Sequence, residues 1–171
     1  MNPNADKINI VSGLKLKWGG NIDVGDFYAK LKLWLFNQGY GNEMKNFKEV
    51  KYLQRIKADG KEIDIKWVGE KNLNDYFANM ITITMSITRM SDVEVMINGK
   101  KVKMNKANIE IKLTADLIKN RSGKWGKYSF IKKIYESFII RERIDQNKMG
   151  LYQKIYGLHD EIKNFFELQK F

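Results

Sequence analysis

The stretch Met80-Ile81-Thr82-Ile83-Thr84-Met85-Ser86-Ile87-Thr88-Arg89 decides the fold of this chain, because apolar and polar residues alternate in it almost without interruption. Strict alternation places successive side chains on opposite faces of a half-buried β-strand. We therefore predict a strand with one apolar face and one face formed by Thr82, Thr84, Ser86 and Thr88. This second face fits a flat surface for a partner, a polar lining inside a curved sheet, or ordinary β-propensity.

Further alternating segments lie on both sides of this strand. They predict strands at Ile8 to Trp18, Phe47 to Lys57, Ile63 to Trp67, Asp92 to Ile97, Lys101 to Met104 and Ile109 to Leu117. Short turns separate several of them, and Asn98-Gly99 is the dipeptide that a type I′ hairpin turn prefers. Short hairpins of this kind predict one antiparallel sheet of about six to seven strands.

Helical periodicity appears before and after these strands. Val24 to Gln38 is predicted as a helix, with Asp23 as its N-cap and Gly39 at its C-terminal end. The C-terminal part predicts one long bent helix or two consecutive helices. The first segment would turn Phe130, Ile131, Ile134, Phe138 and Ile139 inward, and the second Leu151, Ile155, Leu158, Ile162, Phe165 and Phe166.

This order of elements predicts an α+β fold in which the helices pack on one face of the sheet. The chain has 171 residues, which is the length of one domain, so we expect residues 1–171 to form a single domain. Its sheet-rich part would cover residues 8–118, and its helical part residues 127–168.

The composition excludes several kinds of chemistry. The chain has no cysteine and one histidine, His159, so disulfides, thiolate metal sites and most histidine-based catalysis are absent. Glu62 with Asp64, and Asp92 with Glu94, each share a strand face next to lysines, and we interpret both pairs as cross-strand ion pairs. With no phosphate-binding loop or nucleophile motif, we expect a non-catalytic protein without cofactor or metal.

The location of the protein is predicted from two absences. The N-terminal residues lack the charged and apolar regions of a signal peptide, and no apolar run approaches the roughly 20 residues that span a bilayer. We therefore expect a soluble cytoplasmic protein without a transmembrane segment.

The formal net charge is +11, and lysine supplies most of it, because only five residues are arginine. Two segments concentrate the charge and predict an anion-binding site for a partner such as nucleic acid: Lys100, Lys101, Lys103 and Lys106 on a hairpin, and Arg121, Lys124 and Lys127 around Trp125. Each feature has an alternative. Lysines on a hairpin also prevent edge-to-edge aggregation, a tryptophan can cap the core, and the lysine excess can be purely compositional.

Three functions follow as hypotheses. The first is a basic binding protein for nucleic acid or a nucleoprotein assembly. The second is a carrier that encloses an apolar small molecule between the sheet and the long C-terminal helix. The third is a structural or assembly subunit that associates with itself through its sheet surface.

Two resemblances accompany these patterns. Over Val24 to Phe166 the chain resembles a group of small uncharacterised archaeal proteins with no assigned activity. The shared residues are Trp34-Leu35, Gly39-Tyr40, Arg55-Ile56-Lys57, Gly60-Lys61, Trp67, Asp75-Tyr76, Asp92 to Val95, Gly99 to Lys106, Tyr135, Arg141 and Arg143. The order of elements also resembles the helix-grip arrangement of START and polyketide-cyclase-like proteins. Neither resemblance implies a catalytic residue.

Overall fold

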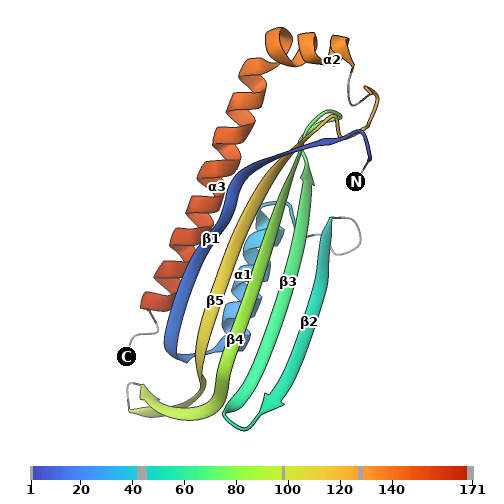
Figure 1. The fold of residues 1–171 in the computed structure, drawn as a ribbon. Coiled ribbons are helices and arrows are strands. Elements are labelled where there is room, and N and C mark those ends of the chain that lie inside the picture. The colour runs from blue at the N-terminus through green and yellow to red at the C-terminus, as the bar shows by residue number, and fades with distance from the viewer. Residues whose placement is uncertain (1, 42–45, 98, 127–128, 169–171) are drawn as a thin grey trace.

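The computed structural model describes residues 2–41, 46–97, 99–126 and 129–168. Five strands, three α-helices and one π-helical turn make up the described part of the chain, and Figure 1 shows their arrangement. The strands are β1 (Asp6–Ile22), β2 (Phe47–Lys57), β3 (Gly60–Asn72), β4 (Ala78–Ile97) and β5 (Lys100–Lys119), and α1 (Val24–Asn37) connects β1 to β2. The C-terminal part consists of α2 (Phe130–Ile134), a π-helical turn η1 (Tyr135–Ile139) and α3 (Arg141–Glu167).

All five strands form one antiparallel sheet in the order β1-β5-β4-β3-β2. Strands β2 to β5 are therefore consecutive neighbours, while β1 pairs with β5 at one edge and the chain must cross to β2 at the other edge. Helix α1 makes this crossing. Its first turn is capped by Asp23, whose Oδ1 accepts a hydrogen bond from the Asp26 N–H at 2.9 Å, as the sequence predicted.

The prediction of six to seven strands is wrong, although the α+β class is confirmed. The interruption after Thr88 is a β-bulge and not the end of a strand. Arg89 has a φ of 53° there, and the ladder continues with Ser91 opposite Lys106. The strands predicted at Met80 to Arg89 and at Asp92 to Ile97 are therefore both parts of β4. The strands predicted at Lys101 to Met104 and at Ile109 to Leu117 are both parts of β5.

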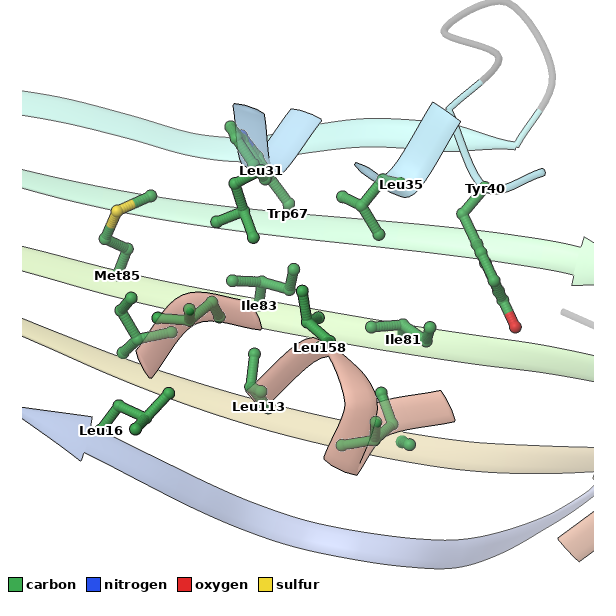
Figure 2. Close-up of a cluster of buried hydrophobic side chains, with 14 of the residues drawn as sticks. Leu16, Leu31, Leu35, Tyr40, Trp67, Ile81, Ile83, Met85, Leu113 and Leu158 are labelled. Carbon is green, nitrogen blue, oxygen red and sulfur yellow. The ribbon is translucent and has the colours of Figure 1, made fainter. Parts of the chain in front are cut away.

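Both long helices pack on the same face of the sheet, where they form the hydrophobic core (Figure 2). Leu31 and Leu35 of α1 and Leu158 of α3 lie over Trp67, Ile83 and Leu113 of the sheet, and all six are buried. The predicted inward residues of α3 are confirmed, with Leu151, Ile155, Leu158, Ile162 and Phe166 buried and Phe165 half-buried against them.

The segment from Phe130 to Ile139 differs from its prediction. Its five apolar side chains were expected to face inward, yet Phe130, Ile131, Ile134, Phe138 and Ile139 are all exposed. The residues that face the sheet are polar or amphipathic instead, namely Lys132, Tyr135 and Glu136, because each finds a partner there. Figure 1 shows this segment turned sharply away from the axis of α3 at one end of the sheet.

None of the helices in the described part of the chain is both long and apolar enough to cross a membrane.

Candidate nucleic-acid interface

The predicted contact residues lie at opposite ends of the molecule (Figure 1). Lys100, Lys101 and Lys103 belong to the first residues of β5, whereas Arg121, Lys124 and Trp125 follow its last residue. Most of the 20-residue strand β5 lies between the two groups, and the distance from Lys103 to Arg121 corresponds to about 60 Å of extended strand. Asn98, half of the predicted turn, and Lys127 lie outside the described residues. One continuous surface therefore does not contain both groups.

The lysines of the hairpin lie next to carboxylates. Lys103 stands directly opposite Glu94 in the β4–β5 ladder, and Lys101 Nζ lies 3.5 Å from Glu94 Oε2. Asp92 lies on the same hairpin and accepts a hydrogen bond from Asn105. The positive charge that the sequence concentrates between residues 100 and 106 is thus partly balanced by the neighbouring strand.

Trp125 is held in place by its own surroundings. Its ring stacks on Tyr135 with ring centroids 5.5 Å apart and an interplanar angle of 17°. The buried side chain of Asn120 donates to the Trp125 carbonyl at 2.7 Å and accepts from its N–H at 3.3 Å. One face of the indole is therefore covered by Tyr135, which leaves at most the other face for stacking with a base.

A different group of cations lies on the outer face of the sheet, which we define as the face opposite α1 and α3. Antiparallel pairing brings outward side chains of successive strands into rows, with about 4.8 Å between neighbouring strands. Three adjacent rows cross the middle of this face. They are Thr114, Thr82, Val68 and Lys48; then Lys15, Lys112, Thr84, Lys66 and Lys51; then Lys17, Glu110, Ser86, Asp64 and Leu53.

The second of these rows, Lys15, Lys112, Thr84, Lys66 and Lys51, is called the lysine row below. It runs through all five strands, and four of its five members are lysines. Lys51 lies directly opposite Lys66, and Lys15 directly opposite Lys112. Like charges that face each other across a ladder repel, so the row is locally unfavourable for the sheet.

Two carboxylates lie beside the lysine row and reduce this repulsion. Asp64 Oδ2 is 3.0 Å from Lys51 Nζ, and Glu110 Oε2 is 3.0 Å from Lys17 Nζ. The Lys51 ammonium holds the pKa of Asp64 below its usual value, and Lys17 has the same effect on the pKa of Glu110. Both acids therefore stay ionised near neutral pH and satisfy part of the charge.

The lysines nevertheless outnumber these carboxylates. All six lysines of the three rows are exposed, and they face only two acids, Asp64 and Glu110. Lys48, Lys66 and Lys112 form no ion pair with any residue that the structure describes. The outer face therefore combines an excess of positive charge with the hydroxyl groups of Thr82, Thr84, Ser86 and Thr114.

Gly13 of β1 lies next to the end of the Lys112 side chain. Gly13 sits at the irregular part of β1 with a φ of 72°, and a Cβ atom there would come within 2.4 Å of Lys112 Cε. A side chain at position 13 would be strained and would displace the lysine. Gly13 thus leaves room for the Lys112 side chain.

The acidic residues of the chain do not assemble into a metal site within the described ranges. The predicted ion pairs of Glu62 and Asp64 are confirmed, with Lys57 and Lys51 of β2 as the partners at 2.8 Å and 3.0 Å. His159 is buried on α3, and its Nδ1 lies 3.1 Å from Asp160 Oδ1.

The lysine row is not apparent from the sequence, because its members are scattered over the chain. Lys15, Lys51, Lys66 and Lys112 belong to four different strands and are separated by at least 15 positions in the sequence. The available signal was parity, since each lysine occupies the polar phase of an alternating strand. Only the register of the sheet brings them onto one line. Of the predicted residues, Lys106 shares this face, because it lies six positions before Lys112 on β5.

Comparisons with known proteins add no family to this description. The chain matches no protein-family model, no curated protein and no solved structure, so both resemblances stated above stay predictions.

Proposed function

We propose that this protein binds nucleic acid, without catalysing a reaction, through the outer face of its sheet. The lysine row carries the proposal, because it places four exposed lysines in register across five strands despite their mutual repulsion. Its length is about 19 Å, the sum of four strand spacings. A DNA duplex carries one negative charge per roughly 1.7 Å of axis, so it presents many phosphates over this distance.

The chemistry of the three rows favours contacts with the nucleic-acid backbone. Lysines neutralise phosphates, and the hydroxyls of Thr82, Thr84, Ser86 and Thr114 donate hydrogen bonds to phosphate oxygens. The rows contain no aromatic residue on which a base could stack. We therefore expect binding that depends little on base sequence and strongly on salt.

The double variant Lys66→Gln/Lys112→Gln tests the proposal, because neither lysine is ion-paired within the described residues. The affinity for a fluorescently labelled duplex is measured by anisotropy at several salt concentrations. Removing two phosphate contacts should reduce the slope of log K against log salt by about 1.8. The affinity at 0.1 M salt should fall by roughly fiftyfold.

The control is Lys133→Gln/Lys163→Gln, which removes the same charge from exposed positions on the helical segments. This control variant should leave the slope of log K against log salt almost unchanged, because a general loss of net charge affects the affinity for nucleic acid only weakly. The proposal would be refuted if the wild-type protein bound neither duplex DNA nor single-stranded RNA at low salt. An equal loss of affinity in both double variants would also count against the lysine row.

A further inference from the structure

The segment from Phe130 to Ile139 has its polar and apolar sides reversed relative to an ordinary surface helix. Its large apolar side chains are turned outward, with exposed fractions of 73% for Phe130, 64% for Ile131, 42% for Ile134, 82% for Phe138 and 68% for Ile139. We call these five residues the apolar tip. Exposed apolar surface of this extent on one short segment is typical of an interaction site.

Specific contacts fix the polar side inward. Lys132 is only 3% exposed and pairs with Asp6 at the start of β1. Glu136 accepts a hydrogen bond from Tyr76 Oη at 2.5 Å, and its other oxygen lies 2.6 Å from Lys119 Nζ at the end of β5. Tyr135 stacks on Trp125. These partners come from four separate parts of the chain, so the orientation of the segment is determined by the fold around it.

The backbone presents the apolar tip away from the rest of the molecule. The π-helical turn ends at Ile139. The next residue, Ile140, has a φ of −117° that interrupts the helix, and its side chain is buried. As a result the tip projects at one end of the sheet and does not continue along α3 (Figure 1). A π-helical turn is often found where a helix serves a function.

The charges around the apolar tip are mostly positive. Lys133, Arg141 and Arg143 are exposed, and none of them forms an ion pair with a described residue. Of the nearby acids, Glu136 is engaged with Lys119, and Asp145 is 3.0 Å from Lys148, which leaves Glu142. Exposed Phe and Ile next to Lys and Arg are the composition of segments that lie in a membrane interface.

We propose that the apolar tip inserts into the surface of a lipid bilayer that carries anionic headgroups. Phe130 and Phe138 would enter the boundary between headgroups and acyl chains, while Lys133, Arg141 and Arg143 would contact the headgroup phosphates. Charge complementarity favours this occupant over a second copy of the chain. Two copies joined tip to tip would bring their cations together, whereas an anionic surface attracts them.

Sedimentation with lipid vesicles tests the proposal. Wild-type protein is mixed with vesicles that contain phosphatidylglycerol, and with vesicles of phosphatidylcholine alone, at 0.1 M salt. We expect binding to the anionic vesicles and much weaker binding to the neutral ones. The variant Phe130→Ser/Phe138→Ser should lower the affinity for anionic vesicles by roughly tenfold or more, because two inserting side chains are lost.

Two controls separate the apolar tip from other surfaces. Phe36→Ser removes an aromatic side chain that is 61% exposed on α1, and it should bind vesicles like the wild type. Lys66→Gln/Lys112→Gln changes the outer face of the sheet and should retain most of the vesicle binding that Phe130→Ser/Phe138→Ser loses.

Three results would overturn the proposal. The first is wild-type protein that does not bind anionic vesicles. The second is binding that depends on Lys66 and Lys112 but not on the two phenylalanines. The third is a wild-type protein that is a dimer in light scattering and does not bind vesicles, together with a Phe130→Ser/Phe138→Ser variant that is a monomer. This outcome would assign the apolar tip to contact with a second copy of the chain.

Discussion

Replacing Lys132 by methionine tests the orientation of the segment from Phe130 to Ile139. Methionine keeps an unbranched apolar stem of similar length and removes the charge. Asp6, whose side chain is 29% exposed, then loses its partner. Breaking a buried ion pair on one side costs about 3–5 kcal/mol, and because Asp6 keeps some access to water we expect a loss of about 2–3 kcal/mol.

The free energy of unfolding is measured by urea denaturation, and the melting temperature by circular dichroism. For a domain of this size a loss of about 2–3 kcal/mol lowers the melting temperature by roughly 5–10 °C. Lys133→Met is the matched control, because Lys133 is the next residue and is exposed. A surface substitution of this kind changes stability by less than about 0.5 kcal/mol.

A double-mutant cycle with Asp6→Asn adds a second measurement. If Lys132 and Asp6 pair as described, the double variant should lose less stability than the two single variants together, with a coupling of about 1–2 kcal/mol. Equal stability of Lys132→Met and Lys133→Met would refute the inward orientation of Lys132. It would also remove the basis for an outward apolar tip.

Three further changes test other parts of the description. Asp64→Asn should raise the affinity for duplex DNA by up to about tenfold in anisotropy assays, because it frees Lys51 for a phosphate. Because the pKa of Asp64 is lowered in the folded state, its stabilising contribution is present above pH about 4 and is lost as the pH falls through the folded pKa. In urea denaturation, the free energy of unfolding of Asp64→Asn should therefore fall less between neutral and acid pH than that of the wild type. Arg89→Gly should stabilise the protein by about 0.5–1 kcal/mol in urea, because a φ of 53° strains a non-glycine residue, whereas Arg55→Gly in extended β2 should destabilise it. Tyr40→Phe should leave the free energy of unfolding unchanged or raise it by up to about 1 kcal/mol, because Tyr40 Oη is buried without a hydrogen-bond partner in the described residues. A clear loss of stability would instead indicate a hydrogen bond between Tyr40 and Asn79.

In β4 the alternating pattern was sufficient to predict which residues form the core face of the sheet. Ile81, Ile83, Met85 and Ile87 are all buried, as their spacing indicates. A strand between helices and solvent must alternate, so its sequence reports the arrangement directly. The number of strands was not predictable in the same way. The bulge at Arg89 shifts the phase of the pattern without ending the strand, and in the sequence a phase shift resembles a turn.

Helical spacing likewise predicted the elements of the C-terminal part but not their orientation. Leu151, Ile155 and Leu158 form an apolar stripe that packs on the sheet, and the residues from Phe130 to Ile139 form a stripe that does not. Periodicity indicates that a helix has two sides, yet it does not indicate which side finds a partner. That choice depends on Asp6, which is 126 residues away from Lys132 in the sequence.

The two proposed surfaces lie at places where the chain departs from the ordinary rules of its secondary structure. Lysines face lysines across the sheet, and a helical segment turns its apolar side to solvent. Locally each arrangement costs stability, and such departures in folded proteins concentrate at functional sites. In both places the surrounding structure supports the departure: Gly13 leaves room for Lys112, and Asp6, Tyr76 and Lys119 bind the polar side of the C-terminal segment. Supporting contacts of this kind distinguish a built surface from a biased composition. The register of the sheet places part of the lysine excess, including Lys66 and Lys112, in one row, and the comparison of Lys66→Gln/Lys112→Gln with Lys133→Gln/Lys163→Gln tests whether that row or the net charge binds nucleic acid.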